Sequence, residues 1–183
     1  MSANVLVAGI GNVLLSDDGF GVEVARRLID RRSELPDSVE VVDFGIRGMH
    51  LAYQLLDGYH TAVLVDTVQR GGAPGELYLL EHDLDQPDPG PGLLDSHGMD
   101  PVAVLATLRA LAASAGVSRP VQRVFVVGCE PAVLEEGLGL SEPVAAAVDH
   151  AVRAVIDLVT EITPVTVTEP RTQGATRVPG HTR

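Results

Sequence analysis

Four aspartates and one histidine in this 183-residue chain have residue types and positions that suit metal chemistry. Asp17 and Asp18 follow a short glycine-containing turn, Asp43 and Asp66 each end a predicted strand, and His97 stands in a later loop. Two of these carboxylates together with the imidazole would make a ligand set that suits nickel, zinc, iron or manganese and disfavours Cu(I). Because these residues are far apart in the sequence, a shared site depends on a fold that brings them together.

Each of these residues also has a simpler structural interpretation. An aspartate at a helix start stabilises the exposed N–H groups and the helix dipole by about 0.3–1 kcal/mol, which accounts for one of Asp17 and Asp18. Asp66 could cap the turn that follows it, and His97 could be a surface residue at a helix start. Residue spacing alone therefore leaves the metal site and the structural interpretation both open.

The composition excludes several other kinds of site. All 13 basic residues are arginine, so the chain has no lysine for a Schiff base, a P-loop or a Ser–Lys dyad. The net charge is −12 and no basic stripe is visible, which argues against nucleic-acid binding. A single cysteine, no basic segment before the first apolar run and no apolar stretch of roughly 18 residues predict a cytoplasmic protein without membrane insertion.

Three other features give weaker signals. Gly9 and Gly11 resemble the start of a dinucleotide-binding loop, but the third glycine is missing and two aspartates put negative charge where a pyrophosphate would bind. Cys129 follows an apolar run and has no adjacent histidine, which favours a buried structural thiol over a nucleophile. Arg47 is either a ligand for a substrate carboxylate or phosphate, or a surface guanidinium in a solvated loop.

The first half of the chain predicts a parallel sheet. Residues 5–9 form a continuous apolar run of the kind found in a buried strand, residues 61–66 are predicted to form another buried strand, and residues 39–43 are predicted to form the strand between them in the sequence. A helix is expected over about residues 19–31, and one of its faces carries Ala25, Leu28 and Ile29. A second, short helix follows Gly48. Alternating strands and helices indicate an α/β sheet with right-handed crossovers, in which ligands bind at the carboxyl ends of the strands.

The second half departs from this alternation. Residues 67–74 are too few for a parallel crossover, so the fourth strand, over residues 75–80, is predicted to be antiparallel. Asp100 and Pro101 have the types that cap and begin a helix. The remaining elements are a fifth strand over residues 123–128 and a last helix over about residues 141–161.

Two segments are predicted to lie outside regular structure. Residues 83–95 are rich in Pro, Gly and Asp and are expected to form an irregular loop. Residues 163–183 have few apolar side chains and are expected to be a disordered tail. The prediction is therefore one domain over residues 1–162 followed by that tail.

Several short blocks occur in a fixed order along the chain. They are Gly9-Ile10-Gly11-Asn12-Val13-Leu14 with Ser16-Asp17-Asp18-Gly19-Phe20-Gly21, Asp43-Phe44-Gly45 with Gly48, Val63-Leu64-Val65-Asp66, His97, and Val127-Gly128-Cys129-Glu130-Pro131 with Gly139-Leu140-Ser141. On these blocks the chain resembles the hydrogenase maturation endopeptidases over about residues 5–158. The first block, followed by Asp66 and His97 in that order, is the specific part of the resemblance.

The resemblance implies a fold and a metal-binding set. The fold is three-layer α/β of the phosphorylase/hydrolase-like kind, a mixed five-stranded sheet of order 2-1-3-5-4 with strand 4 antiparallel and helices on both faces. The metal-contacting residues are Asp18, Asp66 and His97, and the first of these is glutamate in some members. Ile46 stands where many members have threonine, which leaves open whether Arg47 contacts the substrate.

The resemblance also implies a function. Members are endopeptidases that remove the C-terminal extension of a [NiFe] hydrogenase large-subunit precursor after nickel insertion, and the nickel is supplied by that substrate. Asp17 and Asp43 are the candidates for a general base. Two other hypotheses stay open: a non-proteolytic metal-binding or chaperone module for hydrogenase assembly, and a nucleotide-binding α/β domain.

Overall fold

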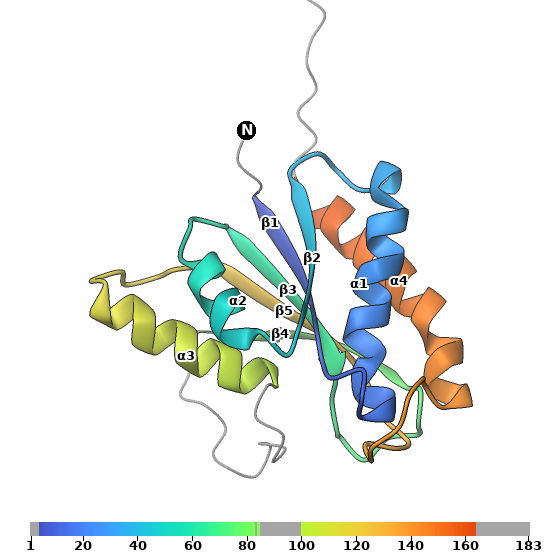
Figure 1. Cartoon of the computed structure of the whole chain (residues 1–183). Helices are drawn as coiled ribbons and strands as arrows, with labels where there is room; N and C mark the ends of the chain where they lie inside the picture. Colours follow the sequence, from blue (N-terminus) through green and yellow to red (C-terminus); the bar gives the residue numbers. More distant parts are fainter. Residues whose placement is uncertain (1–3, 83, 85–99, 164–183) are drawn as a thin grey trace, which may run out of the picture.

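A five-stranded sheet forms the centre of the computed structural model, which describes residues 4–82, 84 and 100–163 (Figure 1). Its strands are β1 (Val5–Ile10), β2 (Val39–Gly45), β3 (Thr61–Thr67), β4 (Leu77–His82) and β5 (Arg123–Cys129). Their order is β2-β1-β3-β5-β4. Neighbouring strands pair in parallel except for β4, which pairs antiparallel with β5. The predicted strand order and the predicted antiparallel fourth strand are both confirmed.

Helices cover both faces of this sheet. They are α1 (Phe20–Asp30), α2 (Gly48–Leu55), α3 (Pro101–Ser114) and α4 (Glu142–Ile162), with 3₁₀ turns η1 (Ser16–Gly19) and η2 (Arg32–Glu34). Helices α1 and α4 pack together on one face, and α2 and α3 on the other (Figure 1). Asp100 caps α3 as predicted, because its carboxylate accepts a hydrogen bond from Ala103 N at 2.7 Å. The three-layer α/β class is therefore confirmed.

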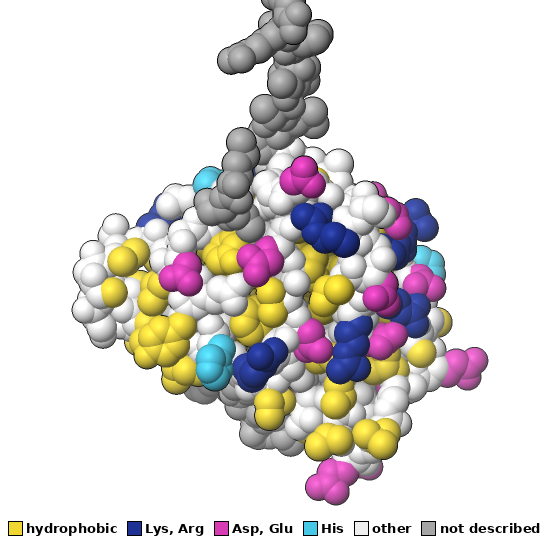
Figure 2. Space-filling view, turned by 45° about the horizontal axis from the view of Figure 1, so that its top comes forward, with side chains coloured by type: hydrophobic (Ala, Val, Ile, Leu, Met, Phe, Trp, Pro, Cys, Tyr) yellow, Lys and Arg dark blue, Asp and Glu magenta, His cyan; other side chains and the backbone are white. Residues whose placement is uncertain are grey.

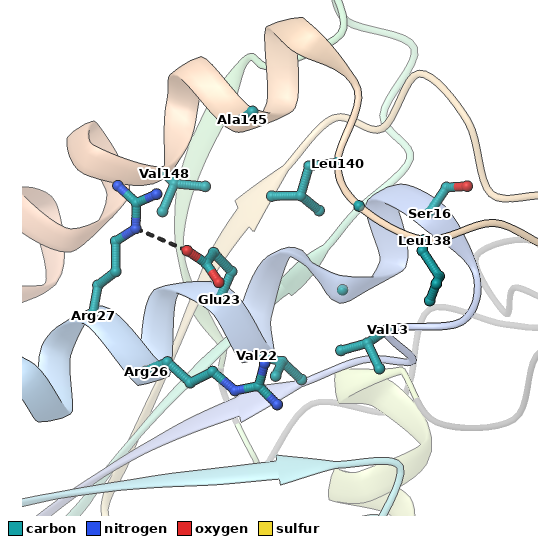
Figure 3. Close-up of a pocket in the computed structure, with 12 residues that line it drawn as sticks. Val13, Ser16, Val22, Glu23, Arg26, Arg27, Leu138, Leu140, Ala145 and Val148 are labelled. Atoms are coloured by element: carbon teal, nitrogen blue, oxygen red, sulfur yellow. Dashed lines mark hydrogen bonds and ion pairs between the residues drawn. The ribbon is translucent and has the colours of Figure 1, made fainter.

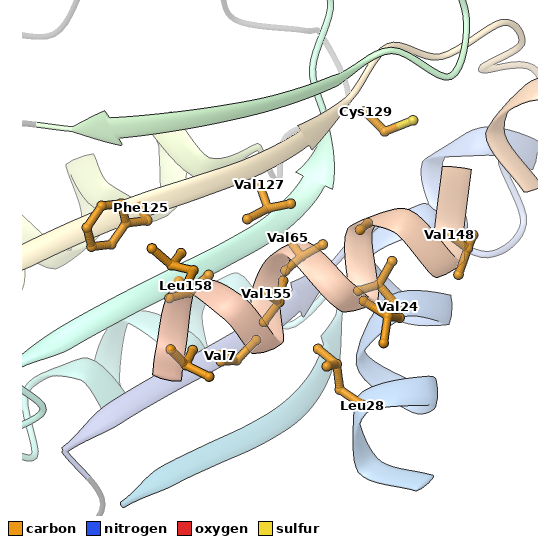
Figure 4. Close-up of a cluster of buried hydrophobic side chains, with 14 of the residues drawn as sticks. Val7, Val24, Leu28, Val65, Phe125, Val127, Cys129, Val148, Val155 and Leu158 are labelled. Carbon is orange, nitrogen blue, oxygen red and sulfur yellow. The ribbon is translucent and has the colours of Figure 1, made fainter. Parts of the chain in front are cut away.

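Each face of the sheet has its own hydrophobic core. Successive side chains of a strand point to opposite faces, so Val5 and Val7 of β1 join the core under α1 and α4, whereas Leu6 joins the core under α2 and α3. Figure 4 shows the first of these cores, where Val155 of α4 lies over the strands. The continuous apolar runs of β1 and β3 are thus explained by burial on both faces.

Two glycines allow α1 to lie very close to the central strands. A Cβ atom on Gly21 would stand 2.1 Å from the carbonyl oxygen of Val65 and 2.3 Å from that of Ile10. A Cβ atom on Gly9 would stand 2.3 Å from the carbonyl oxygen of Gly21. This close approach fixes the start of α1 against the ends of β1 and β3, where the candidate site lies.

Two details of the sequence prediction are wrong. Ile29 is 46% exposed, although Ala25 and Leu28 of the same predicted face are buried, because the helix surface covered by β-strands and α4 does not extend to it. Strand β4 begins at Leu77 rather than at Gly75. Gly75 instead lies in a turn with φ of 86°, and its N–H donates to the carbonyl oxygen of Glu130 at 2.8 Å.

Several predictions fall on residues outside the described ranges. They concern His97, the loop over residues 83–95 apart from Leu84, and the tail over residues 164–183. The last helix ends at Ile162, which agrees with the expected end of regular structure near that position. None of the helices in the described part of the chain is long and apolar enough to cross a membrane.

Candidate functional site

Asp18 and Asp66 meet beside the central strands, at the edge of the sheet where the parallel strands end. Asp18 lies in η1, just after β1, and Asp66 lies near the end of β3, which pairs with β1. Thr67 connects them: its N–H donates to Asp66 Oδ1 at 2.7 Å and its hydroxyl donates to Asp18 Oδ1 at 3.3 Å. The fold thus brings together two of the three residues expected to contact a metal.

The loop after β1 holds Asp18 through its backbone. Asn12 N–H donates to Asp18 Oδ2 at 2.7 Å, so each carboxylate oxygen of Asp18 has a donor. Gly11 makes this conformation possible, because its φ is 137° and a Cβ atom there would stand 1.8 Å from the carbonyl oxygen of Asp18. The same Cβ position is 3.7 Å from Asp66 Oδ1, which places Gly11 against both aspartates.

The electrostatics of Asp66 favour a neutral carboxyl group unless a cation is near. Asp66 is only 3% exposed, and burial raises the pKa of its carboxyl group well above its ordinary value. The negative charges of Asp18 and Asp100 raise it further, while the hydrogen bond from Thr67 N–H opposes the shift. A bound cation would relieve both the repulsion and the cost of burying the charge, so this donor set suits a metal ion.

Asp17, one of the two candidate general bases, points away from this pair. Its buried carboxylate accepts hydrogen bonds from Ala132 N at 2.8 Å, Val133 N at 2.9 Å, and Ser141 N and Oγ at 2.6 and 2.9 Å. Burial alone would raise the pKa of Asp17, but these hydrogen bonds outweigh it and lower the pKa. The contacts tie η1 to the segment between β5 and α4, and they give no support to a proton-transfer role.

Asp43, the other candidate general base, stays partly exposed at the end of β2. Its Oδ2 lies 3.3 Å from Arg26 Nε, and its side chain is 29% exposed. The pairing of β1 with β2 shifts register here, so that Gly9 is opposite Asp43 while Ile10 is opposite Gly45. Such an irregularity re-aims side chains at the end of a strand.

Comparison with known proteins decides the family. The profile of the hydrogenase maturation protease family matches residues 22–158, which is most of the chain. The chain belongs to this family. Its sequence is similar to Hydrogenase 2 maturation protease of Escherichia coli, with 30% identity over 152 residues, 83% of this chain and 88% of the relative. It is also 32% identical over 157 residues to a putative hydrogenase maturation protease of Methanocaldococcus jannaschii, covering 84% and 94% of the two chains.

Solved structures of the family share the fold. The hydrogenase maturating endopeptidase HybD from E. coli superposes with a TM-score of 0.66 at 25% identity, covering 88% of this chain and 93% of that one. The hydrogenase 2 maturation peptidase from a Thaumarchaeota archaeon gives a TM-score of 0.64 at 34% identity, covering 86% and 98%. The resemblance seen in the sequence blocks is thereby confirmed.

Glu130 supports the site of this maturation protease, and the sequence analysis had it only within a motif block and not among the candidate site residues. Its carboxylate accepts hydrogen bonds from Arg70 N at 2.8 Å, Gly71 N at 3.2 Å and Tyr78 Oη at 3.0 Å. These bonds hold the β3–β4 connection, which begins directly after Thr67. The signal in the sequence was an acidic residue in a motif block after an apolar strand, which does not distinguish a ligand from a loop anchor.

Cys129 has the structural character expected from the sequence. The residue is fully buried, and burial raises the pKa of its thiol to about 12, with further contributions from the charges of Asp17 and Glu130. A thiol with such a pKa is almost entirely protonated near neutral pH and is a poor nucleophile. The described part of the maturation protease therefore offers no activated cysteine.

Arg47 folds back onto its own strand end. Its Nε donates to the carbonyl oxygen of Phe44 at 3.1 Å, and its Nη2 donates to that of Asp43. The guanidinium carbon lies 5.9 Å from the centroid of the Phe44 ring. These contacts favour a local capping role for Arg47, and its contact with a substrate stays a prediction.

A pocket of about 380 Å³ lies beside the site, between α1 and the start of α4 (Figure 3). Its walls are largely apolar, with Val22 from α1 and Leu140 from the segment before α4, and the ion pair of Glu23 with Arg27 lies at its rim. Figure 2 shows one face of the molecule on which arginine and acidic side chains are interspersed with hydrophobic ones. None of the described candidate residues lines the pocket, so the carboxylate pair remains the candidate site.

Proposed function

We propose that this maturation protease removes the C-terminal extension of a [NiFe] hydrogenase large-subunit precursor after nickel insertion, and that it recognises the substrate's nickel through Asp18, Asp66 and His97. The observation that carries the proposal is the pair of carboxylates that Thr67 connects at the carboxyl edge of the sheet. Within residues 4–82, 84 and 100–163, neither carboxylate forms an ion pair with an arginine. Two neighbouring carboxylates with no cationic partner among these residues support the proposal that the pair receives an incoming cation.

The proposed third ligand, His97, precedes the start of α3 by four residues in the sequence. Asp100, three residues after His97, acts on the charge of Asp66, so the start of α3 lies near the pair. Three residues of extended chain reach at most about 11 Å. A chain of this length allows the His97 imidazole to reach the two carboxylates, and the proposal requires that it does.

The small size of the proposed ligand set is the basis of a checkpoint. Even with His97 the set is small, and thiolates of the substrate that already hold nickel would complete it. A precursor without nickel would then dock poorly, and its C-terminus would stay uncut.

The proposed chemistry of cleavage follows from binding the substrate's nickel at the carboxylate pair. Nickel carried by the substrate would polarise the scissile carbonyl or lower the pKa of a water molecule. Asp43 is the better candidate for a general base, because it is partly exposed at the same edge of the sheet whereas Asp17 is saturated with hydrogen bonds. We place the reaction in the cytoplasm, in accordance with the single unpaired cysteine.

Processing of purified precursors tests the proposal. The intact mass of a nickel-loaded large-subunit precursor should fall by the mass of its C-terminal extension on incubation with the protein, and that of a nickel-free precursor should not change. Asp18→Asn, Asp66→Asn and His97→Ala should each abolish the change, whereas the exposed-site control Asp30→Asn should not. Binding of the loaded precursor without any loss of mass would instead favour the non-proteolytic chaperone hypothesis.

A further inference from the structure

Thr67 is bonded to both carboxylates of the candidate site. Its backbone N–H donates to Asp66 Oδ1 at 2.7 Å, and its hydroxyl lies 3.3 Å from Asp18 Oδ1. Thr67 therefore donates one hydrogen bond to each aspartate of the pair, from its backbone to Asp66 and from its side chain to Asp18.

The position of Thr67 is set by the sheet rather than by a loop. It is the last residue of β3 and pairs with Cys129 of β5, and the next residue, Val68, donates its N–H to the carbonyl oxygen of Cys129 at 3.0 Å. Threonine is branched at Cβ, which restricts χ1 to few rotamers. The hydroxyl therefore has few available positions, and from the one observed it can orient the Asp18 carboxylate.

Asp18 needs such an orienting donor. Asn12 N–H holds Oδ2 and the Thr67 hydroxyl holds Oδ1, so the two donors together define the plane of the carboxylate. Each oxygen of an ionised carboxylate can accept more than one partner, so one hydrogen bond on each oxygen leaves a lone pair for a metal ion. Without the hydroxyl, Asp18 would keep one donor and could turn about its side-chain bonds.

We propose that Thr67 is a positioning residue for nickel recognition: its N–H fixes Asp66 and its hydroxyl fixes Asp18, so that both carboxylates face the same ion. The inference rests on the proposed function, because it assigns Thr67 to the same site. Residues that orient metal ligands typically change metal affinity or activity by about 10–100-fold when they are replaced. The hydroxyl of Thr67 should have an effect of this size.

Two substitutions separate the hydroxyl from the shape of the side chain. Thr67→Val keeps the β-branched volume and removes the donor, whereas Thr67→Ser keeps the donor and removes the methyl group. Thr107→Val is the matched control, since the hydroxyl of Thr107 donates to the carbonyl oxygen of Ala103 in α3 at 2.9 Å, away from the candidate ligands. Circular dichroism and Tm identify any variant that fails to fold.

The first measurement reads the orientation of Asp18 without metal or substrate. Three-bond NMR couplings report χ1 of Asp18, and we expect one rotamer in the wild type, Thr67→Ser and Thr107→Val, but averaging between rotamers in Thr67→Val. An Asp18 rotamer that stays single and unchanged in folded Thr67→Val would overturn the inference. This result does not depend on whether the protein cuts a precursor.

The second measurement is kcat/KM for processing of the nickel-loaded precursor. We expect Thr67→Val to lower it by about 10–100-fold and Thr67→Ser to restore most of the loss. Equal activity of Thr67→Val and the wild type would overturn the inference while leaving the proposed function intact, and so would an equal loss in Thr67→Ser. If the wild type itself does not cut, the proposed function fails, and the rotamers of Asp18 alone decide whether Thr67 positions the pair.

Discussion

Asp66 places a carboxyl group where burial and the charge of Asp18 both oppose its ionisation. The side chain therefore lowers the stability of the metal-free protein at neutral pH, as functional groups at binding sites commonly do. Asn can replace Asp66 without this charge, and its amide oxygen can still accept the hydrogen bond from Thr67 N–H. In the metal-free protein, Asp66 thus supplies a reactive group at a cost in stability.

Asp66→Asn should raise Tm at pH 7 in the presence of a chelator while abolishing processing. The folded pKa of Asp66 lies above the unfolded value, so its destabilisation is full above the folded pKa and vanishes as pH falls to about 4, the unfolded value. The Tm difference between variant and wild type should therefore shrink over that range, where each kcal/mol corresponds to about 2–4 °C for a chain of this size. A variant less stable than the wild type at pH 7 would contradict the assignment.

Asp17 has the opposite effect on stability. Asp17→Asn replaces one acceptor oxygen by a donor that faces the N–H groups of Ser141 or of Ala132 and Val133. We expect the free energy of unfolding at pH 7 to fall by about 1–3 kcal/mol, measured by urea denaturation. Because the folded pKa of Asp17 is lowered, its contribution is present above about pH 4 and is lost as pH falls through the folded pKa.

The exposed aspartate Asp30 provides the control for this experiment. Asp30→Asn should leave the free energy of unfolding nearly unchanged both at pH 7 and at pH 2.5. An equal loss of stability in Asp17→Asn at pH 7 and at pH 2.5, or no loss at all, would show that the hydrogen bonds to Asp17 do not hold the two segments together.

At the scale of residues, the sequence located the aspartates but did not show their directions. Asp17 and Asp18 are adjacent and chemically identical, yet one bonds to Ala132, Val133 and Ser141 and the other to Asn12 and Thr67. The partners of Asp17 are 115 to 124 positions away in the chain. Local patterns carry no information on such contacts, so the orientation of each carboxylate required the folded structure.

At the scale of elements, the close contact between α1 and the central strands predicts how a glycine substitution in α1 affects stability and activity. Gly21→Ala should lower the free energy of unfolding by about 3 kcal/mol or more, since the new Cβ would meet two backbone carbonyl oxygens that cannot move aside without displacing β1 or β3. Because the start of α1 follows Asp18 directly, processing activity should fall as well. Urea denaturation and the precursor assay measure the two effects.

Gly116→Ala controls for the general effect of replacing a glycine. Gly116 has φ of 70°, and nothing lies within 4 Å of its Cβ position. Only the backbone conformation opposes alanine there, at a cost of about 1–2 kcal/mol, and processing should be unaffected. Similar losses in Gly21→Ala and Gly116→Ala would mean that close packing of α1 on the strands is not what Gly21 provides.

The elements themselves were largely predictable, for reasons that differ between strands. Continuous apolar runs identified β1, β3 and β5 because these strands are buried on both faces. The direction of β4 followed from the length of its connection to β3, which is a constraint of chain reach. Its start was predicted two residues early because the turn that contains Gly75 depends on a hydrogen bond to Glu130, far along the chain.

At the scale of the whole molecule, the members of both hydrophobic cores among residues 4–82, 84 and 100–163 lie between Val5 and Ile162. The last helix, α4, contributes Leu158 and Val159 near its end, which are 7% and 0% exposed. A domain that ends at residue 162 thus already contains every side chain of the described cores. The role of the residues after 162 can therefore be tested by truncation without disturbing the described cores.

Truncation after Thr163 should leave Tm within about 2 °C of the full chain, a difference that corresponds to less than about 1 kcal/mol. Processing of the nickel-loaded precursor should continue at the same rate, because Asp18, Asp66 and His97 all precede the cut. The matched control is truncation after Asp157, which removes Leu158 and Val159 from the core under α1 and α4. Loss of buried side chains of this size typically costs about 2–5 kcal/mol each, so the shorter chain should unfold at a much lower temperature. A large drop in Tm on truncation after Thr163 would instead extend the domain beyond residue 162.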